Sequence, residues 1–276
     1  MSKTKNNLKN YLTSFIYASG ITFSMYIAID ELHRFQNRPS FLIFSAIIFI
    51  ILLLENLIAV FARKKSIEIN LNFQDEVNEL WHLFYKFILP LIYYISLVAF
   101  GYYNLFNTAL YLVLAVTFFT FFVLFVNTKA FFDDIKTLES KTHYVYDIIK
   151  FLTFFTLINT ISNYHLNHSD LSLLLALIVG IITFTLSSLM IQRVQKLNQV
   201  SLLYPTVLGI IVSVLFFALN QLSNFNPLQI SLGLLFVFYL SLAIIHHVLL
   251  NTLTRAILLE YLVIASAVFI VVFGIT

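Results

Sequence analysis

The stretch LQISLGLLFVFYLSLAIIHHVLL, residues 228–250, decides the fold class. It runs for 23 residues without Asp, Glu, Lys or Arg. A helix needs about 20 mainly apolar residues to cross the hydrocarbon core of a bilayer. The stretch therefore predicts a transmembrane helix, with two histidines at its end.

Eight further stretches of the same kind lie along the chain. They predict spans at about 11–29, 41–62, 80–102, 105–127, 147–163, 171–192, 199–219 and 256–275. The fifth, 147–163, is the weakest, because it is short and carries Asn159 and several hydroxyls. The predicted fold class is all-α: a polytopic integral membrane helical bundle of about nine transmembrane helices, or eight if the fifth is incomplete. Because the loops are short, residues 1–276 are predicted to form a single domain.

The overall composition supports a membrane protein and excludes several function classes. Hydrophobic residues make up 60% of the chain and charged residues 11%, against about 25% charged in a soluble domain. No basic stripe suited to nucleic acid appears. The chain has no cysteine, which excludes disulfides, thiolate catalysis and cysteine-bearing metal sites. P-loop, dinucleotide and H-E-x-x-H motifs are absent.

Orientation follows from the distribution of Lys and Arg, which accumulate on the cytoplasmic side of membrane proteins. If the N-terminus is cytoplasmic and all nine segments cross, 13 basic residues fall on or beside the cytoplasmic face, and only Arg34 and Arg38 fall outside. Dropping any middle span would destroy this bias, so the bias favours a complete fifth span. We predict a cytoplasmic N-terminus, an uncleaved first span and a bacterial cytoplasmic (inner) membrane.

Two longer cytoplasmic loops and the scarcity of Gly and Pro complete the architecture. In loop 128–146, Phe131, Phe132 and Ile135 share a helical face, which is typical of a short interfacial helix, or of a fourth span that continues past the bilayer. The other long loop, 63–79, alternates apolar residues and then turns acidic. Six Gly and four Pro in the whole chain predict regular helices packed by large side chains, with few faces of small residues.

Ionisable residues inside predicted spans mark the candidate site, because such residues are functional by default. With the predicted orientation they all lie in the cytoplasmic third of the membrane. On the third span, His82 and Lys86 share a face; on the eighth, the spacing i, i+4 and i+8 places His247, Asn251 and Arg255 roughly on one stripe. The predicted intramembrane polar cluster comprises Glu55, His82, Lys86, His246, His247, Asn251, Arg255 and Glu260.

Three functions fit this cluster. It lines a cytoplasm-facing vestibule for passage of a small solute or ion; it forms an enzyme site acting on lipid head groups; or its members only pair, in a non-catalytic scaffold or assembly subunit. Passage is the leading hypothesis, and the sequence leaves open whether the chain is an enzyme. No cofactor and no metal site are predicted, and the expected partners are membrane lipids and a small solute or ion, with no nucleic acid.

Overall fold

The structure is a computed structural model of the whole chain, and it describes residues 2–35, 39–43, 45–50, 89–104, 108–131, 135–191, 199–221 and 225–273. Within these ranges the only regular secondary structure is helical, and they contain no β-strand. The all-α fold class is therefore confirmed.

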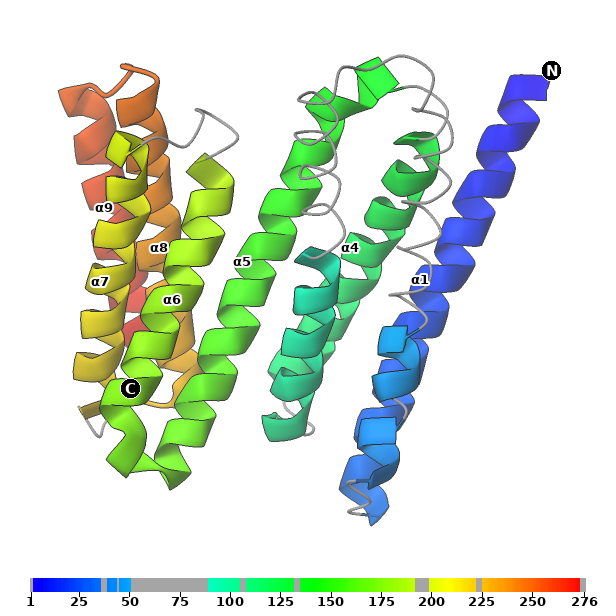
Figure 1. Cartoon of the computed structure of the whole chain (residues 1–276), viewed down its shortest axis with the longest axis horizontal. Coiled ribbons are helices and arrows are strands. Elements are labelled where there is room, and N and C mark those ends of the chain that lie inside the picture. The colour runs from blue at the N-terminus through cyan, green and yellow to red at the C-terminus, as the bar shows by residue number, and fades with distance from the viewer. Residues whose placement is uncertain are drawn as a thin grey trace. The chain divides into compact units, whose positions relative to one another are not determined.

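From α4 to α9, the labelled helices follow one another along the chain with only a few residues between them (Figure 1). Two further helical segments lie at 39–50, apart from residue 44, and at Leu89–Tyr103. The labelled elements are α1 (Ser2–Phe35), α4 (Thr108–Phe131), α5 (Ile135–Asn167), the 3₁₀ turn η1 (Ser169–Leu171), α6 (Ser172–Ile191), α7 (Gln199–Gln221), α8 (Pro227–Leu249) and α9 (Arg255–Phe273).

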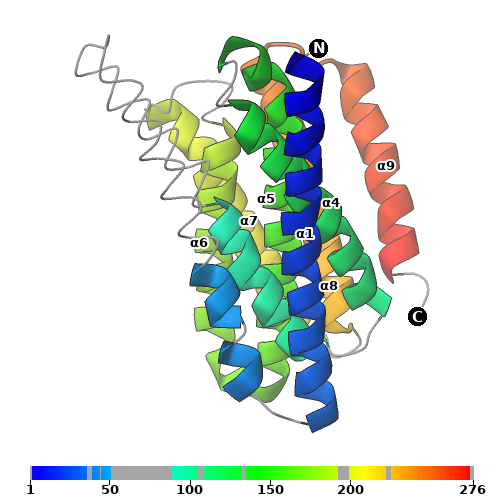
Figure 2. The same ribbon diagram turned by 90° about the vertical axis from the view of Figure 1, so that its right-hand side faces the viewer.

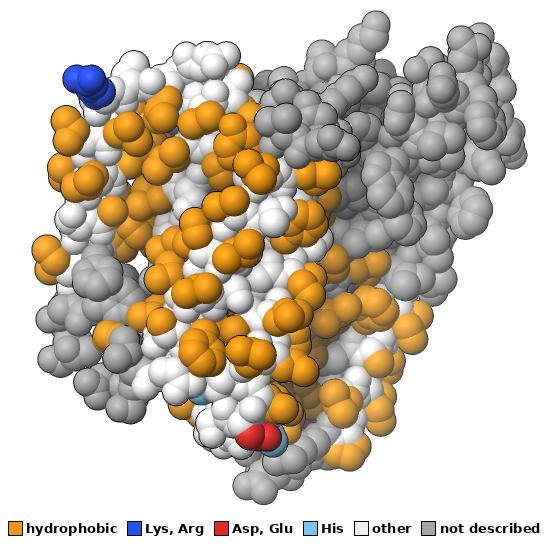
Figure 3. Space-filling model, turned by 60° about the vertical axis from the view of Figure 1, so that its left-hand side comes forward, with side chains coloured by type: hydrophobic (Ala, Val, Ile, Leu, Met, Phe, Trp, Pro, Cys, Tyr) orange, Lys and Arg blue, Asp and Glu red, His pale blue; other side chains and the backbone are white. Residues whose placement is uncertain are grey.

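Among the described residues, four helical stretches are long and apolar enough to cross a membrane: Tyr11–Leu32, Ser169–Ile191, Ser201–Gln221 and Pro227–Leu249. On the face shown in Figure 3, hydrophobic side chains cover the middle, and the charged side chains among the described residues appear only near the two ends. This is the surface expected of helices whose sides meet lipid and whose ends meet water. The total of nine spans stays a prediction.

Helix bounds in the C-terminal half agree closely with those predicted from hydropathy. The predicted spans 171–192, 199–219, 228–250 and 256–275 correspond to α6, α7, α8 and α9, each within two residues at either end. In contrast, residues 51–62 of the predicted second span, residues 80–88 of the predicted third span and the whole of loop 63–79 lie outside the described part of the chain.

Helix α5 is much longer than the predicted fifth span. It begins at Ile135 and runs without interruption to Asn167, so most of the predicted loop 128–146 is the first part of this helix. The described residues of that loop do not form a separate interfacial helix, because α4 continues to Phe131 and only residues 132–134 separate it from α5.

Contacts divide the chain into two compact units, Met1–Lys150 and Phe151–Thr276. In the first unit, α1 runs alongside α4 in both views (Figures 1 and 2), and the ring of Phe15 meets that of Phe118 edge-on at 5.5 Å. Buried tyrosines join the remaining segments: the Tyr93 hydroxyl lies 2.8 Å from that of Thr117, and the Tyr94 hydroxyl donates to the Ser45 carbonyl at 3.0 Å. Aromatic contacts and hydrogen bonds of buried tyrosine hydroxyls thus hold the helices of this unit together.

In the second unit, α6 and α7 form the most extensive helix pair, and they touch through small residues. A Cβ added to Gly209 would lie 2.9 Å from the Gly180 carbonyl oxygen. One turn along α7 from Gly209, the Ser213 hydroxyl donates to the Ala176 carbonyl at 2.7 Å. The sequence predicts few faces of small residues, and this is one of them: Ala176–Gly180 and Gly209–Ser213 are two small-xxx-small pairs that let the backbones meet.

Helix α8 begins where the sequence supplies a complete capping box. The Asn226 side chain accepts from the Gln229 backbone N–H at 2.8 Å, and the Gln229 side chain accepts from the Asn226 N–H at 3.1 Å. Pro227 occupies the first helical position, where its missing N–H costs nothing. This fixes the start of α8, and with it the register of the residues that α8 presents to α5 and α9.

Candidate functional site

The polar string at residues 246–255 is a helix stop and a turn. The N–H of Asn251 donates to the Val248 carbonyl at 3.1 Å, and the N–H of Thr252 donates to the His247 carbonyl at 2.9 Å. Asn251 has φ 54. These are the bonds and the left-handed residue of a Schellman motif, in which Asn replaces the more common Gly.

The turn changes the geometry predicted for His247, Asn251 and Arg255. Because α8 ends at Leu249 and α9 begins at Arg255, the three residues do not follow one helical stripe. His246, Asn251, Arg255 and Glu260 are exposed, and His247 is half-buried. Within the described ranges, no three His, Asp or Glu side chains gather as metal ligands.

His247 connects the two helices of this hairpin. Its Nδ1 lies 2.8 Å from the Thr252 hydroxyl, and its ring is 6.0 Å from that of Tyr261 on α9. These contacts hold the turn against the first part of α9. The other predicted members of the cluster, Glu55, His82 and Lys86, lie outside the described residues, so their convergence with the hairpin stays a prediction.

The part of α5 that belongs to the second unit carries several polar side chains on one side of the helix. Successive residues turn by about 100°, which places five polar residues within about 120° of arc. We call this set the polar face of α5; it consists of Thr153, Thr156, Asn159, Thr160 and Asn163. Thr153, Thr156 and Asn159 are all 0% exposed.

Side chains on this face bond to the helix that carries them. The Thr156 hydroxyl donates to the Leu152 carbonyl and the Thr160 hydroxyl to the Thr156 carbonyl, both at 2.8 Å. A hydroxyl that donates in this way keeps lone pairs that accept further hydrogen bonds. The hydroxyls of Thr156 and Thr160 are thus bonded to the backbone of α5 itself.

Asn159 links the polar face to α8. Its Nδ2 donates to the Ser231 hydroxyl at 3.3 Å, and its Oδ1 accepts from Asn163 Nδ2 at 3.0 Å. Next to this network, the rings of Phe154 and Phe238 stack with centroids 4.3 Å apart. The α5–α8 contact is thus close-packed on one side and hydrogen-bonded on the other.

A titratable group lies beyond each end of the polar face. Lys150 is 2% exposed and forms an ion pair with Asp147 at 3.2 Å, which a buried cation needs to offset its desolvation. At the other end, His165 Nε2 lies 2.7 Å from the Ser172 hydroxyl. Sequence reasoning noted Asn159 and the hydroxyls only as a weakness of the span. The signal it missed was their spacing around a single face.

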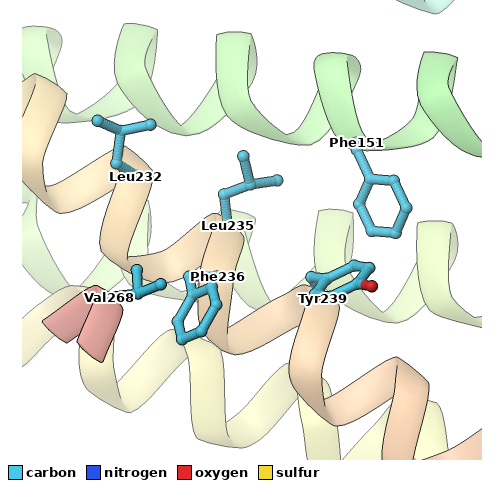
Figure 4. A pocket seen from close by; sticks show the side chains of 6 residues that line it. All are labelled: Phe151, Leu232, Leu235, Phe236, Tyr239 and Val268. Carbon is cyan, nitrogen blue, oxygen red and sulfur yellow. The ribbon is translucent and has the colours of Figure 1, made fainter. Parts of the chain in front are cut away.

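A separate, apolar pocket of about 280 Å³ lies on the second unit (Figure 4). Phe151 reaches it from α5 and points toward Tyr239 of α8, with ring centroids 5.6 Å apart. Val268 reaches it from α9. The full lining is Phe151, Leu232, Leu235, Phe236, Tyr239 and Val268.

Comparison with known proteins gives one match. A family model described as "Protein of unknown function (DUF5656)" matches residues 33–275. The chain belongs to the DUF5656 family. No curated protein and no solved structure matches it.

The DUF5656 match covers every feature of the second unit described above. The polar face of α5, the Schellman turn and the apolar pocket all lie within residues 33–275, whereas most of α1 precedes the matched region. The family description assigns no activity, so function has to be argued from these features.

Proposed function

We propose that this DUF5656 protein provides passage for a small cation or polar solute across the bacterial cytoplasmic membrane, along the polar face of α5. The observation that carries the proposal is the gathering of five polar side chains within about 120° of one helix. Polar residues are costly inside a membrane, and they face a protein interior or a water-filled cavity. A helix that only had to fill space would not need them.

The chemistry of the face suits a cation or a solute with hydrogen-bond donors. The hydroxyls of Thr156 and Thr160 donate to their own backbone, a hydroxyl that donates can also accept a hydrogen bond, and hard cations are bound by oxygen ligands. From Thr153 to Asn163 the face extends about 15 Å along the helix, roughly half the hydrocarbon thickness. The vestibule predicted from Glu55, Lys86 and Glu260 stays a prediction from the sequence.

A scaffold is the second candidate, and one observation favours it. The Asn159 side chain is bonded to Ser231 and Asn163, and hydrogen bonds of this kind also serve only to hold membrane helices together. The enzyme hypothesis needs His82 and a carboxylate beside His247. In the described part of the chain, the side-chain contacts of His247 are with His246, Thr252 and Tyr261.

The cysteine-free chain makes accessibility a direct test of passage. We would introduce single cysteines at Thr156 and Thr160 on the polar face, and at Ile158 and Ile161 on the opposite face as matched controls. Each would be treated, in sealed vesicles, with a small charged thiol reagent that does not cross membranes. Passage predicts labelling of the two polar-face cysteines at least about tenfold faster than the controls, because the thiolate forms only in water.

Equal and slow labelling at all four positions would contradict passage. It would mean that the polar face is dry and that its hydrogen bonds only hold α5 in place, which is the scaffold hypothesis. Labelling would be compared with that of a cysteine at His168 in the α5–η1 connection, an exposed position, to establish that the reagent is active.

A further inference from the structure

We infer that the apolar pocket between α5, α8 and α9 binds the acyl chain of an anionic membrane lipid, whose head group lies at the α8–α9 turn beside His246 and Arg255. This site is distinct from the polar face of α5. Phe151, the α5 residue that lines the pocket, is about 80° beyond the nearest edge of the polar face around the helix axis.

The pocket has the chemistry and size of a site for one hydrocarbon chain. Its lining consists of apolar and aromatic side chains, and the Tyr239 hydroxyl is the only polar side-chain group among them. Its volume of about 280 Å³ is at the lower limit for sites that hold whole small molecules, about 300–1,000 Å³. It therefore fits part of a flexible chain better than a complete ligand.

The pocket is open toward its surroundings at the side of the helices. Leu232 is 38% exposed and Tyr239 is 49% exposed, so a chain can enter laterally. Pro227–Leu249 is one of the stretches able to cross a membrane, and the medium beside such a helix is the lipid itself. Acyl chains are thus the apolar ligands present there at the highest concentration.

Depth in the membrane also fits a lipid. Seven residues separate Tyr239 from His246, and 14 separate Leu232 from His246, so the pocket lies about 10–20 Å along the helix from the turn. Each leaflet contributes about 15 Å of hydrocarbon. A lipid with its head group at the turn therefore places the middle and end of its chain in the pocket.

Charge at the turn selects the head group. Arg255 is exposed at the start of α9, His246 is exposed at the end of α8, and no described acidic residue forms an ion pair with either. Arg binds phosphate through a planar set of donors, and the start of a helix adds a favourable field for an anion. Glu260, the acidic residue of α9, lies five residues and thus about 7.5 Å further along the helix axis than Arg255.

Quenching by brominated lipids tests the site in the full chain. Trp81 is the only tryptophan, so a Trp81→Phe background with Phe236→Trp places one reporter at the pocket. A matched reporter, Leu177→Trp, replaces a residue of α6 that is 58% exposed. Each would be reconstituted in vesicles of phosphatidylcholine containing a fixed fraction of either phosphatidylglycerol or phosphatidylcholine brominated near mid-chain.

We expect brominated phosphatidylglycerol to quench more than brominated phosphatidylcholine at the pocket reporter, and not at the matched reporter. A cation near the surface favours anionic lipid by about 1 kcal/mol, so brominated phosphatidylglycerol should occupy the site about fivefold more than brominated phosphatidylcholine. Arg255→Gln should reduce that preference toward one, Arg255→Lys should retain most of it, and Leu177→Trp should show no preference.

Two results would overturn the inference. Equal quenching of Phe236→Trp by both lipids would mean that the pocket meets only unselected bulk lipid. Absence of quenching at Phe236→Trp, with normal quenching at Leu177→Trp, would mean that side chains keep the pocket closed to acyl chains.

Discussion

Asn251 is the residue at which the polar stretch 246–255 turns, and it explains why this stretch, predicted as part of a site, forms the end of a helix. A non-glycine residue in the left-handed conformation costs about 1–2 kcal/mol, and Asn bears this cost better than most residues. Asn251 has φ 54, and the two hydrogen bonds of the Schellman motif lie around it. Together they end α8 and turn the chain toward α9. The sequence contained this signal, an Asn just past the last apolar position, but the ionisable neighbours drew attention instead.

Substitutions at Asn251 test this explanation. Asn251→Gly should leave the free energy of unfolding unchanged or raise it slightly, since Gly adopts positive φ without strain. Asn251→Val should lower it by about 1–2 kcal/mol, because a β-branched residue is strained there. Stability would be followed by thermal unfolding in detergent. Equal stability of the Gly and Val variants would show that the turn does not depend on this conformation.

At the scale of elements, the sequence predicted the existence of the helices better than their contacts. Hydropathy placed the ends of α6, α7, α8 and α9 within two residues, because an uninterrupted apolar run has few alternatives. Hydropathy could not show that Gly180 and Gly209 are in contact, because it contains no information about which residues on different helices pack together. Average hydropathy likewise hid the polar face of α5, because averaging discards the angular position of each residue.

The close approach of α6 and α7 predicts that two Gly→Ala substitutions change the stability of the protein in opposite directions. Gly209→Ala should destabilise the protein by about 1–3 kcal/mol, because the new methyl group would lie 2.9 Å from a backbone oxygen that has no freedom to move away. Gly20→Ala is the matched control: nothing lies within 4 Å of its Cβ position, so the better helix propensity of Ala should stabilise slightly. Thermal unfolding of the two variants would be compared. A Gly209→Ala variant as stable as Gly20→Ala would contradict the close packing.

The whole molecule is a member of the DUF5656 family, and the described part of the chain is helical, with four stretches long and apolar enough to span a membrane. The nine-span topology rests on the distribution of Lys and Arg between the two sides of the membrane. Each loop is assigned to a side by counting the spans before it, so the assignment depends most on whether α5, the weakest predicted span, crosses. The residues of the polar face are also the ones that lower the mean hydropathy of α5. Single-domain organisation also stays a prediction, because the two compact units are described separately.

The measurement that tests the account most directly is the sidedness of the two ends of α5. Single cysteines at Lys141 and His168 would be labelled in intact cells and in inside-out vesicles with an impermeant thiol reagent. Because α5 is one continuous helix from Ile135 to Asn167, a crossing helix predicts that His168→Cys reacts only from outside and Lys141→Cys only from the cytoplasm. If both react from the same side, α5 does not cross the membrane, and neither the nine-span topology nor passage along its polar face holds.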